Sequence, residues 1–328
     1  MKNKHAVIAV AVLLALAVPA RSQVKYGGYL ALEYIKGQAE SPYPHGNIEN
    51  LLAGFLAAGR VGQKFGFTIE VRALGVNEFD LDQAWAGLMP SQAFTVRVGL
   101  YLVPFGTWNT ASRPHETLLI RTPLNLEFLY PASWRDLGVL VEGQVGVLSY
   151  AAYLGNGLAE GDTDPVVQQF RDNNTDKAKG GRIGLTMGQG VKAGVSYYTG
   201  KYDAQNMRDL TLEGVDLSWV TEQWEIHGEI TKAFLENPQP YARGKSEGYS
   251  IWACMGFKSF QPVGSFQKLK FTDPFHNGGI ALDQSRWTAG LRYVLSSTLF
   301  LKAEYDWNRE KGTALKNNQW QVQVGLSF

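Results

Sequence analysis

Three ionisable side chains occupy every second position in one short stretch of the chain. Glu225, His227 and Glu229 would share one face of an extended strand, where side chains two residues apart lie about 7 Å from each other. Carboxylate and imidazole groups at that spacing could hold a metal ion. The pattern also fits a hydrated, charged wall that pairs with Lys or Arg on neighbouring strands. We favour this second interpretation and expect no metal site.

A calcium-type motif fails at its defining positions. Asp172, Asn174 and Asp176 begin like a calcium-binding loop, but Lys177 stands where that loop needs glycine and Ile183 where it needs glutamate. A solvated loop is the better interpretation.

Catalysis has little support in the sequence. The histidines after the first, His45, His115, His227 and His276, stand in no recognisable nucleophile motif. A Ser–His pair could still form between distant strands, so an outer-membrane barrel hydrolase stays open as the less favoured alternative. We expect no enzyme and no cofactor.

The elements that must position these residues are short segments of alternating polarity. In the last one, Trp320, Val322, Val324, Leu326 and Phe328 share one face, and the opposite face is polar or small. Side chains alternate between faces in a strand. Lipid on one side and water on the other would produce this pattern, with aromatic residues at both membrane interfaces. The segments 64–73, 93–102, 223–232, 286–295 and 298–308 alternate in the same way.

About sixteen such segments can be counted, and the links between them are alternately short and long. The sequence therefore predicts an all-β fold, a transmembrane antiparallel up-and-down β-barrel of about sixteen strands, with fourteen and eighteen as open alternatives. The expected strands are 24–36, 49–61, 64–74, 78–89, 92–103, 136–145, 147–155, 180–188, 190–200, 209–219, 223–234, 247–259, 264–272, 285–295, 298–308 and 317–328.

Composition and the N-terminus agree with an exported barrel. Glycine (36 residues) and aromatic residues are abundant, and only 19% of residues are charged. A formal net charge of +1 gives no reason to expect nucleic acid as a partner. Lys2 and Lys4 precede an apolar run too short to span a bilayer, and Ala20 and Ser22 suit signal peptidase. We predict a cleaved signal peptide over residues 1–22 and an outer-membrane barrel over 23–328.

One connection, residues 104–135, is long and apolar. It contains four prolines and leucine-rich stretches such as Leu118–Leu119 and Leu124–Leu126. Loops of this length inside compact domains are usually functional, and one this apolar should pack against something. We expect it to fold inward after the fifth strand and narrow the pore. An external lid and a loop that contacts a second subunit remain alternatives.

The stretch before this loop resembles a known family. Val98-Gly99-Leu100-Tyr101-Leu102-Val103-Pro104-Phe105-Gly106 is similar to the Gly-x-Phe-x-x-Pro-Phe-Gly stretch of the phosphate-selective porin O and P family, with Leu100 in place of the Phe. The last two hairpins, 286–328, are also similar in pattern. The resemblance implies a sixteen-stranded outer-membrane barrel, usually a homotrimer, with its third external loop folded inward. In the phosphate-selecting members, arginines and lysines line the way to the constriction.

The charges of this chain depart from that last feature. The loop contains Arg113, Arg121 and Arg135 but no lysine, and it also carries Glu116 and Glu127. Carboxylates weaken the field that draws an anion. The cations expected to face the lumen are balanced by acids: Arg72, Arg97, Arg182, Lys192, Lys258, Lys268, Lys270, Arg286, Arg292 and Lys302 stand against Glu70, Glu142, Glu225, Glu229, Glu304 and Asp306.

The sequence thus predicts a porin for passive diffusion of small hydrophilic solutes and ions, with a phosphate- or anion-selective porin as the alternative. Its expected partners are outer-membrane lipids, the solutes and two further copies of the chain. The residues expected at the constriction and in the lumen are Glu70, Arg72, Arg97, Arg113, His115, Glu116 and Arg121. Opposed charges there, with Arg97, Arg113 and Arg121 facing Glu70 and Glu116, would create a transverse field across the pore.

Overall fold

The structure is a computed structural model that describes residues 23–75, 78–131, 133–161, 165–256, 259–276 and 282–328. The predicted signal peptide over residues 1–22 lies outside the described residues, and so does Lys258.

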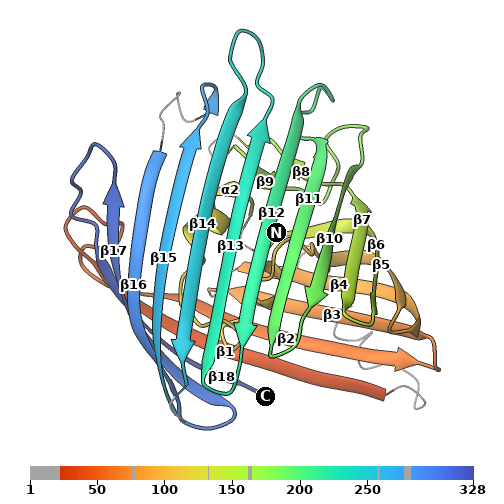
Figure 1. Ribbon diagram of the computed structural model, residues 1–328, viewed down its shortest axis with the longest axis horizontal. Helices are drawn as coiled ribbons and strands as arrows, with labels where there is room; N and C mark the ends of the chain where they lie inside the picture. Colours follow the sequence, from red (N-terminus) through yellow and green to blue (C-terminus); the bar gives the residue numbers. More distant parts are fainter. Residues whose placement is uncertain (1–22, 76–77, 132, 162–164, 257–258, 277–281) are drawn as a thin grey trace.

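Sixteen strands of the described chain close into one antiparallel barrel, as the sequence predicts (Figure 1). Each strand pairs with its neighbours along the chain, and the last strand pairs with the first. The barrel strands are β1 (Gln23–Gly37), β2 (Asn47–Val61), β3 (Phe65–Leu74), β4 (Glu78–Ser91), β5 (Phe94–Leu102), β6 (Arg135–Val145), β7 (Leu148–Gly155), β10 (Ala178–Thr186), β11 (Val191–Lys201), β12 (Asp209–Val220), β13 (Trp224–Leu235), β14 (Gly244–Met255), β15 (Phe260–Thr272), β16 (Leu282–Val294), β17 (Leu299–Glu310) and β18 (Gln319–Ser327).

The remaining elements lie in connections. β8 (Leu158–Ala159) and β9 (Val167–Gln168) form a small hairpin after β7. The long connection between β5 and β6 contains the 3-10 helix η1 (Asn109–Ala111) and the short α-helix α2 (Leu124–Leu129). No helix among the described residues has the length and apolar character needed to cross a membrane.

The long and short connections lie at opposite rims of the barrel. Figure 1 shows the β12–β13 turn at the bottom of the view and the β13–β14 connection at the top. In outer-membrane barrels the short turns face the periplasm and the longer loops face outside. We therefore call the rim with the long connections the outer rim.

Strand β18 closes the barrel and shows how the two faces differ. Its register pairs Gln323 with Glu33 of β1, and the Phe328 carbonyl accepts a hydrogen bond of 2.9 Å from the Gly28 amide. The side chain of Gln323 is buried inside, whereas Trp320 and Val324 are 40% and 46% exposed on the outside. The alternation predicted for this segment is confirmed.

The predicted orientation of two lysines is wrong. The inward positions of β15 are odd-numbered and include the fully buried Leu269 and nearly buried Gln267 and Phe271. Lys268 and Lys270 consequently face outward rather than into the lumen. The physical reason is that the interior beside the end of β15 is apolar: Leu269 belongs to a buried cluster with leucines of the 104–135 connection, so a rule that places polar residues inside fails at this end of the strand.

Candidate pore constriction

We call the segment from Val103 to Trp134 the inner loop. Two glycines, one in β5 and one at the start of the inner loop, set the backbone conformation where this loop begins. Gly99 has φ +130°, and a Cβ there would lie 2.3 Å from the Ala84 carbonyl oxygen. Gly106 has φ +63°, and a Cβ there would lie 2.6 Å from Glu229 Oε2. L-residues rarely adopt these conformations and have no room for a side chain here. Both glycines belong to the stretch 98–106. Their positions in this stretch allow the backbone conformations with which the chain passes from β5 into the inner loop.

Glu229 of β13 holds the start of the inner loop. Its Oε1 accepts hydrogen bonds from the amides of Thr107 and Trp108 at 2.6 and 2.8 Å, and from Thr107 Oγ1 at 2.7 Å. Glu225 instead contacts His227 Nε2 at 2.9 Å, and the His227 ring stacks on Trp252. The three side chains do not converge on one point. Within the described ranges, no group of three or more His, Cys, Asp or Glu side chains is arranged to hold a metal ion.

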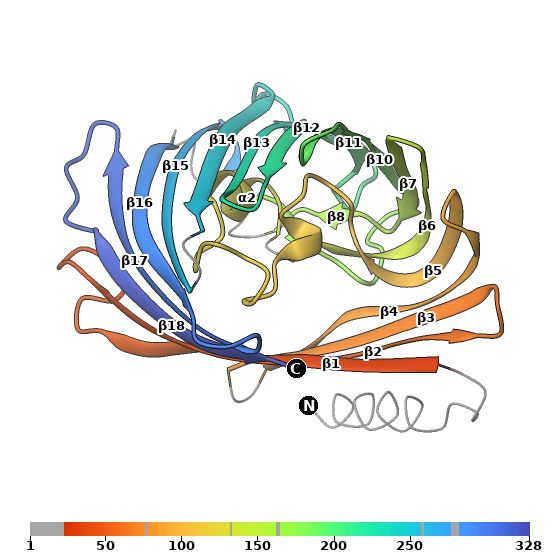
Figure 2. The ribbon, with the colours of Figure 1, turned by 60° about the horizontal axis from the view of Figure 1, so that its bottom comes forward.

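One side of the barrel interior is filled by apolar packing. Figure 2 shows the inner loop inside the ring of strands, beneath β11 to β14, and α2 contacts β13, β14 and β15. Trp134 is fully buried, with its ring 5.8 Å from Phe105, 5.3 Å from Tyr130 and 4.9 Å from Tyr198 of β11. We call this region the apolar seat. Its strand members are Tyr153, Tyr198, Leu210, Leu212, Ala233, Leu235, Trp252 and Leu269.

The middle of the inner loop is held by the opposite side of the interior. Lys302 Nζ of β17 donates to the Pro114 carbonyl at 2.7 Å and to Thr117 Oγ1 at 3.0 Å. The Glu304 carboxylate accepts a hydrogen bond of 3.0 Å from the Ile120 amide. We call this side, formed by β16–β18 and β1–β4, the polar wall. Its buried polar side chains are Glu33, Thr68, Glu70, Asp82, Gln83, Arg286, Thr288, Lys302, Glu304, Asp306, Gln319, Gln321 and Gln323.

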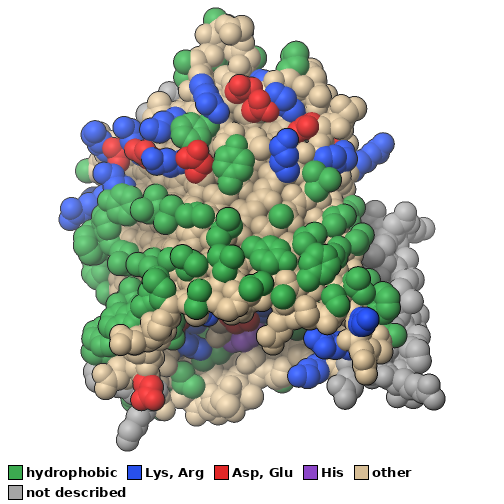
Figure 3. All heavy atoms as spheres, turned by 45° about the vertical axis from the view of Figure 1, so that its right-hand side comes forward, with side chains coloured by type: hydrophobic (Ala, Val, Ile, Leu, Met, Phe, Trp, Pro, Cys, Tyr) green, Lys and Arg blue, Asp and Glu red, His purple; other side chains and the backbone are tan. Residues whose placement is uncertain are grey.

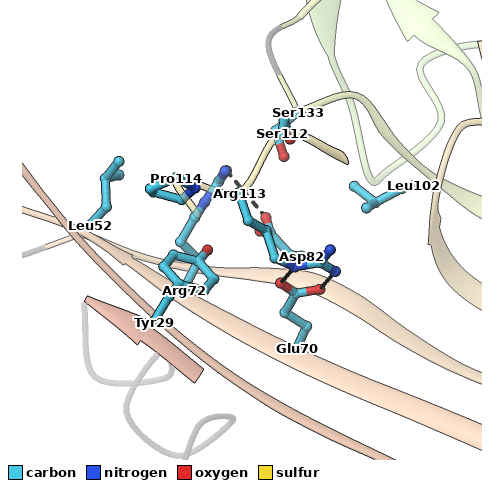
Figure 4. Close-up of a pocket in the computed structure, with 10 residues that line it drawn as sticks. All are labelled: Tyr29, Leu52, Glu70, Arg72, Asp82, Leu102, Ser112, Arg113, Pro114 and Ser133. Atoms are coloured by element: carbon cyan, nitrogen blue, oxygen red, sulfur yellow. Dashed lines mark hydrogen bonds and ion pairs between the residues drawn. The ribbon is translucent and has the colours of Figure 1, made fainter. Parts of the chain in front are cut away.

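Arg113 joins the inner loop to the polar wall (Figure 4). Its Nε and Nη2 each donate to the Glu70 carboxylate at 2.7 Å, and its Nη1 donates to Glu116 Oε2 at 2.9 Å. Burial would lower the pKa of Arg113, but hydrogen bonds with Glu70 and Glu116 outweigh it and raise that pKa above its ordinary value. Gln83 of β4 also donates to Glu70, at 2.8 Å. A paired, bidentate guanidinium of this kind keeps its charge and its position.

A narrow cavity lies between the polar wall and the inner loop at this contact. It measures about 30 Å³, enough for a few water molecules. Figure 4 shows its lining: Tyr29, Leu52, Glu70, Arg72, Asp82, Leu102, Ser112, Arg113, Pro114 and Ser133. Glu70, Arg113 and Tyr29 also line a wider cavity of about 380 Å³, which reaches Thr298 and Phe328 at the rim with the short turns.

The structure brings together some of the residues predicted for the site. Glu70, Arg113 and Glu116 form one cluster, and the His115 ring lies 5.6 Å from the Tyr29 ring beside it. Arg72 lines the same cavity, where its Nη2 lies 3.2 Å from Asp82 Oδ1.

Two predicted residues lie elsewhere. Arg97 pairs with Glu142, stacks 4.4 Å above the Trp85 ring and lines a separate cavity together with Arg182. Arg121 pairs with Glu127 at 2.8 Å. The expected transverse field needs cations and acids that face each other across an opening, whereas each of these arginines is in direct contact with a carboxylate.

Sequence reasoning missed Tyr29 and Asp82, which line the cavity, and Gln83, which donates a hydrogen bond to Glu70. Tyr29 lies on an inward position of β1, which the alternation of that strand could have revealed. Asp82 and Gln83 are consecutive and both buried, because a register shift between Glu70 and Val71 of β3 inserts one extra residue in β4. A bulge of this kind leaves no regular signal in the sequence.

Comparison with known proteins gives a consistent picture of family and fold. A protein-family model described as "Gram-negative porin" matches residues 9–328. An uncharacterized protein of Aquifex aeolicus is 24% identical over 221 residues, which cover 62% of this chain and 51% of the relative. The chain thus spans about half the length of that curated relative.

Two solved structures are similar across almost the whole chain. An anion-selective porin from Comamonas acidovorans has a TM-score of 0.70 at 14% identity, with 94% of this chain and 99% of that chain covered. The trimer form of OmpT, an outer-membrane protein of Vibrio cholerae, has a TM-score of 0.67 at 13% identity, with the same coverage. At these identities the similarity concerns the fold alone.

Proposed function

The chain belongs to the Gram-negative porin family and is an outer-membrane channel for passive diffusion, and we propose that the ion pair of Arg113 and Glu70 lines the narrowest part of its pore. A sixteen-stranded barrel is wide enough to enclose water, so the inner loop must set the limit on solute size. The supporting observation is that Arg113, on a loop packed into the apolar seat, reaches Glu70 on the polar wall at 2.7 Å.

Single-channel conductance and reversal potentials in planar bilayers test this proposal. Arg113→Gln removes the cation and leaves Glu70 and Glu116 behind, so we expect larger conductance steps and a shift toward cations. Arg121→Gln is the matched control, because Arg121 pairs with Glu127 and does not line the cavity. If Arg113→Gln leaves both conductance and ion preference unchanged, Arg113 does not stand at the constriction.

The mature protein in this proposal is the barrel of residues 23–328, released from a signal peptide of residues 1–22, with residues 104–135 as the constriction loop. N-terminal sequencing of the protein extracted from outer membranes checks the cleavage site. Deletion of the middle of the loop, residues 112–121, should raise the conductance if this segment narrows the pore.

Ion selectivity is weak in this proposal. Arg72, Arg97, Arg113 and Arg121 are all paired with carboxylates, and paired charges attract a passing ion less than free ones do. Phosphate selectivity, which the resemblance of stretch 98–106 to the porin O and P family raises, would need unpaired cations at the constriction. Conductance in chloride compared with phosphate at equal ionic strength distinguishes a general porin from a phosphate-selective one.

We also propose that the channel has no enzymatic activity. We propose further that three copies of the chain assemble into a homotrimer. The trimer form of the Vibrio cholerae protein supports the assembly by analogy of fold. β3 presents Phe67, Ile69 and Val71 outward, an apolar face that suits either lipid or a second copy. Light scattering of the detergent-solubilised protein, corrected for bound detergent, measures whether the mass is that of three chains.

A further inference from the structure

A large cavity of the interior, separate from the constriction, has no part in the proposed function. It measures about 580 Å³ and is lined by residues of β5, β6, β7 and β10. Two of its lining residues, Gln92 and Gln144, lie at or next to short turns, so the cavity is near the rim with those turns. Figure 3 shows the molecule hollowed at this rim, below a band of hydrophobic side chains, with basic and acidic side chains in the hollow. The interior is therefore open to water on the side where the cavity lies.

Small residues on neighbouring strands leave the room for this cavity. Antiparallel pairing places Arg182 of β10 opposite Ala151 of β7, and Ala151 opposite Glu142 of β6. In the next inward row toward the turns, Gly184 of β10 lies opposite Ser149 of β7. Because neighbouring strands are about 4.8 Å apart, the Cα atoms of Arg182 and Glu142 stand about 10 Å apart. Between the two charged residues the wall carries only the methyl group of Ala151.

The basic end of the cavity presents an unused hydrogen-bond donor. Arg182 Nε and Nη2 donate to the Asp216 carboxylate at 2.9 and 2.5 Å, and among the described residues its Nη1 has no partner. A Cβ on Gly184 would lie 2.9 Å from this Nη1 and 2.5 Å from Ser149 Oγ. The glycine thus leaves a space bordered by a guanidinium N–H and a hydroxyl. These donors suit the oxygens of a carboxylate.

The acidic end of the cavity presents an unused acceptor. Glu142 Oε1 accepts a hydrogen bond from Arg97 Nη2, and within the described ranges its Oε2 accepts none. The Glu142 side chain is 28% exposed, so a solute can reach it. The Arg97 guanidinium lies 4.4 Å above the Trp85 ring, which holds the pair in place. A carboxylate oxygen of this kind forms a strong hydrogen bond with an ammonium group.

The two ends together fit a solute whose positive and negative groups are far apart. Arg182 and Glu142 each have one ionic partner already, so a solute with a single charge would find a free partner at one end only. An extended peptide advances about 3.3–3.6 Å per residue, so the charged ends of a tripeptide are about 10 Å apart. This length matches the spacing of Arg182 and Glu142. A free α-amino acid carries both charges on one carbon and is too short.

We propose that this cavity is a binding subsite for short zwitterionic peptides of about three residues. The C-terminal carboxylate would lie at Arg182 and Ser149, and the N-terminal ammonium group at Glu142. The peptide backbone would pass over Ala151, where the wall is low. The inference rests on the barrel being an open channel and not on where its pore is narrowest.

Block of the ion current by peptides tests the subsite on the full chain in planar bilayers. The probe is triglycine at neutral pH, added on both sides. The readout is the blocking constant, the peptide concentration that gives half of the maximal loss of conductance. N-acetyl-triglycine amide, which lacks both charges, should have a blocking constant about a hundredfold higher, since each charge-assisted hydrogen bond contributes about tenfold. Glycine should block no better than this capped peptide.

Peptides capped at one end assign each charge to its residue. Glu142→Gln should raise the blocking constants of triglycine and triglycine amide about tenfold, because both keep the ammonium group, and should leave that of N-acetyl-triglycine unchanged. Arg182→Gln together with Asp216→Asn should weaken block by triglycine and N-acetyl-triglycine and leave the amide unchanged. The Asp216→Asn substitution is included because the Asp216 side chain is 1% exposed and would otherwise be a buried charge without a partner.

Two size variants test the cavity without altering any charge. Ala151→Leu fills the floor between the two ends and should raise the blocking constant of triglycine by about tenfold or more through steric exclusion. Ala152→Leu is the matched control, because Ala152 is exposed on the outward face of the same strand, and it should change the blocking constant by less than about threefold. The heat-modifiable migration of each variant on gels verifies that its barrel is folded.

Three results would overturn the peptide subsite. These are equal block by triglycine and the doubly capped peptide, equal effects of Ala151→Leu and Ala152→Leu, or a blocking constant of triglycine that neither charge variant changes. Block by N-acetyl-triglycine as strong as that by triglycine would also overturn it, in favour of a site for carboxylates alone. If Arg113→Gln leaves the conductance unchanged while triglycine blocks as expected, only the pore proposal fails, and the opposite pattern overturns the subsite alone.

Discussion

The apolar seat and the polar wall are built from strands of the same barrel, yet their inward faces have opposite character. Inward positions of β12 and β13 carry Leu210, Leu212 and Leu235, whereas those of β17 carry Lys302 and Glu304. The difference follows from what covers each face. Leucines face inward where the inner loop packs on them, and charged residues face inward where they bind the backbone of the loop or line the water path.

The comparison shows that one loop is fixed by two kinds of interaction. Its ends are buried with aromatic residues such as Trp134 in the apolar seat, and its middle is held by side chains of the polar wall, such as Glu70 and Lys302. Packing gives the loop its stability, and the charged contacts position the few side chains that we propose a solute meets. Substitutions in the two regions should therefore change different properties of the channel.

The largest effect is expected from Trp134→Ala in the apolar seat. Removing a fully buried ring that contacts Phe105, Tyr130 and Tyr198 should cost about 3–5 kcal/mol of folding free energy. Urea unfolding of the detergent-solubilised protein measures this loss. Trp320→Ala, on the outward face, is the control and should cost much less. Equal losses in the two variants would mean that the seat does not stabilise the barrel.

A smaller loss of folding free energy is expected from Glu229→Ala. This substitution removes the carboxylate that accepts hydrogen bonds at the start of the inner loop. The amides of Thr107 and Trp108 would lose this acceptor, at a cost of about 1–3 kcal/mol. The loop should become more mobile, seen as noisier open-channel current together with lower stability in urea. Glu225→Ala, two residues away but bonded to His227, should leave the current quiet. Noise in both variants would contradict a specific anchor at Glu229.

In the polar wall the main expected effect is a change of ion selectivity. Glu70→Gln removes the carboxylate that neutralises Arg113, so anions should become more permeant relative to cations. A unit charge at about 4 Å in water contributes about 1 kcal/mol, which corresponds to about fivefold in the permeability ratio. Reversal potentials in a salt gradient give this ratio. A shift toward cations, or none, would show that Glu70 is not next to the path of the ions.

The smallest effect is a pH dependence at His115. Burial lowers the pKa of His115 below its ordinary value, so the ring is uncharged at neutral pH. The neutral ring therefore contributes to the free energy of folding in full at pH values above the ordinary pKa of about 6.5. This contribution is lost as the pH falls through the lowered pKa of His115. Anion preference should rise slightly on acidification to below the ordinary value of about 6.5, and this step should be absent in His115→Gln. A midpoint above pH 6.5 in the parent would contradict it.

Much of the fold could be predicted from the sequence because apolar residues recur at every second position of the strands, on the outward face of the barrel. The outward faces of the barrel strands are rich in apolar residues, so Trp287, Leu291 and Leu301 alternate visibly with polar residues. Sixteen segments and the alternation of short and long links follow from that pattern. The rule fails for β15, where Leu269 and Phe271 face inward and Lys268 and Lys270 face outward, because the inner loop makes this part of the interior apolar.

The candidate site could be predicted in its residue types but not in its contacts. Arg113, Glu70 and Glu116 stand out as charges on the loop and on a strand that it could reach. Their direct pairing depends on how far the inner loop extends from the apolar seat, which local sequence does not encode. The same holds for Asp82, which points inward only because of the bulge in β4.

The pairing of β18 with β1 has a consequence for how the protein folds. The hydrogen bond from Gln323 Nε2 to Glu33 Oε1 joins residues 290 positions apart, and contacts between such distant residues form slowly. Until the C-terminal strand docks, the sheet has two unpaired edges, which invite association with other chains. Closure therefore waits until β18 has been synthesised, and the unclosed chain has to be shielded on its way to the membrane.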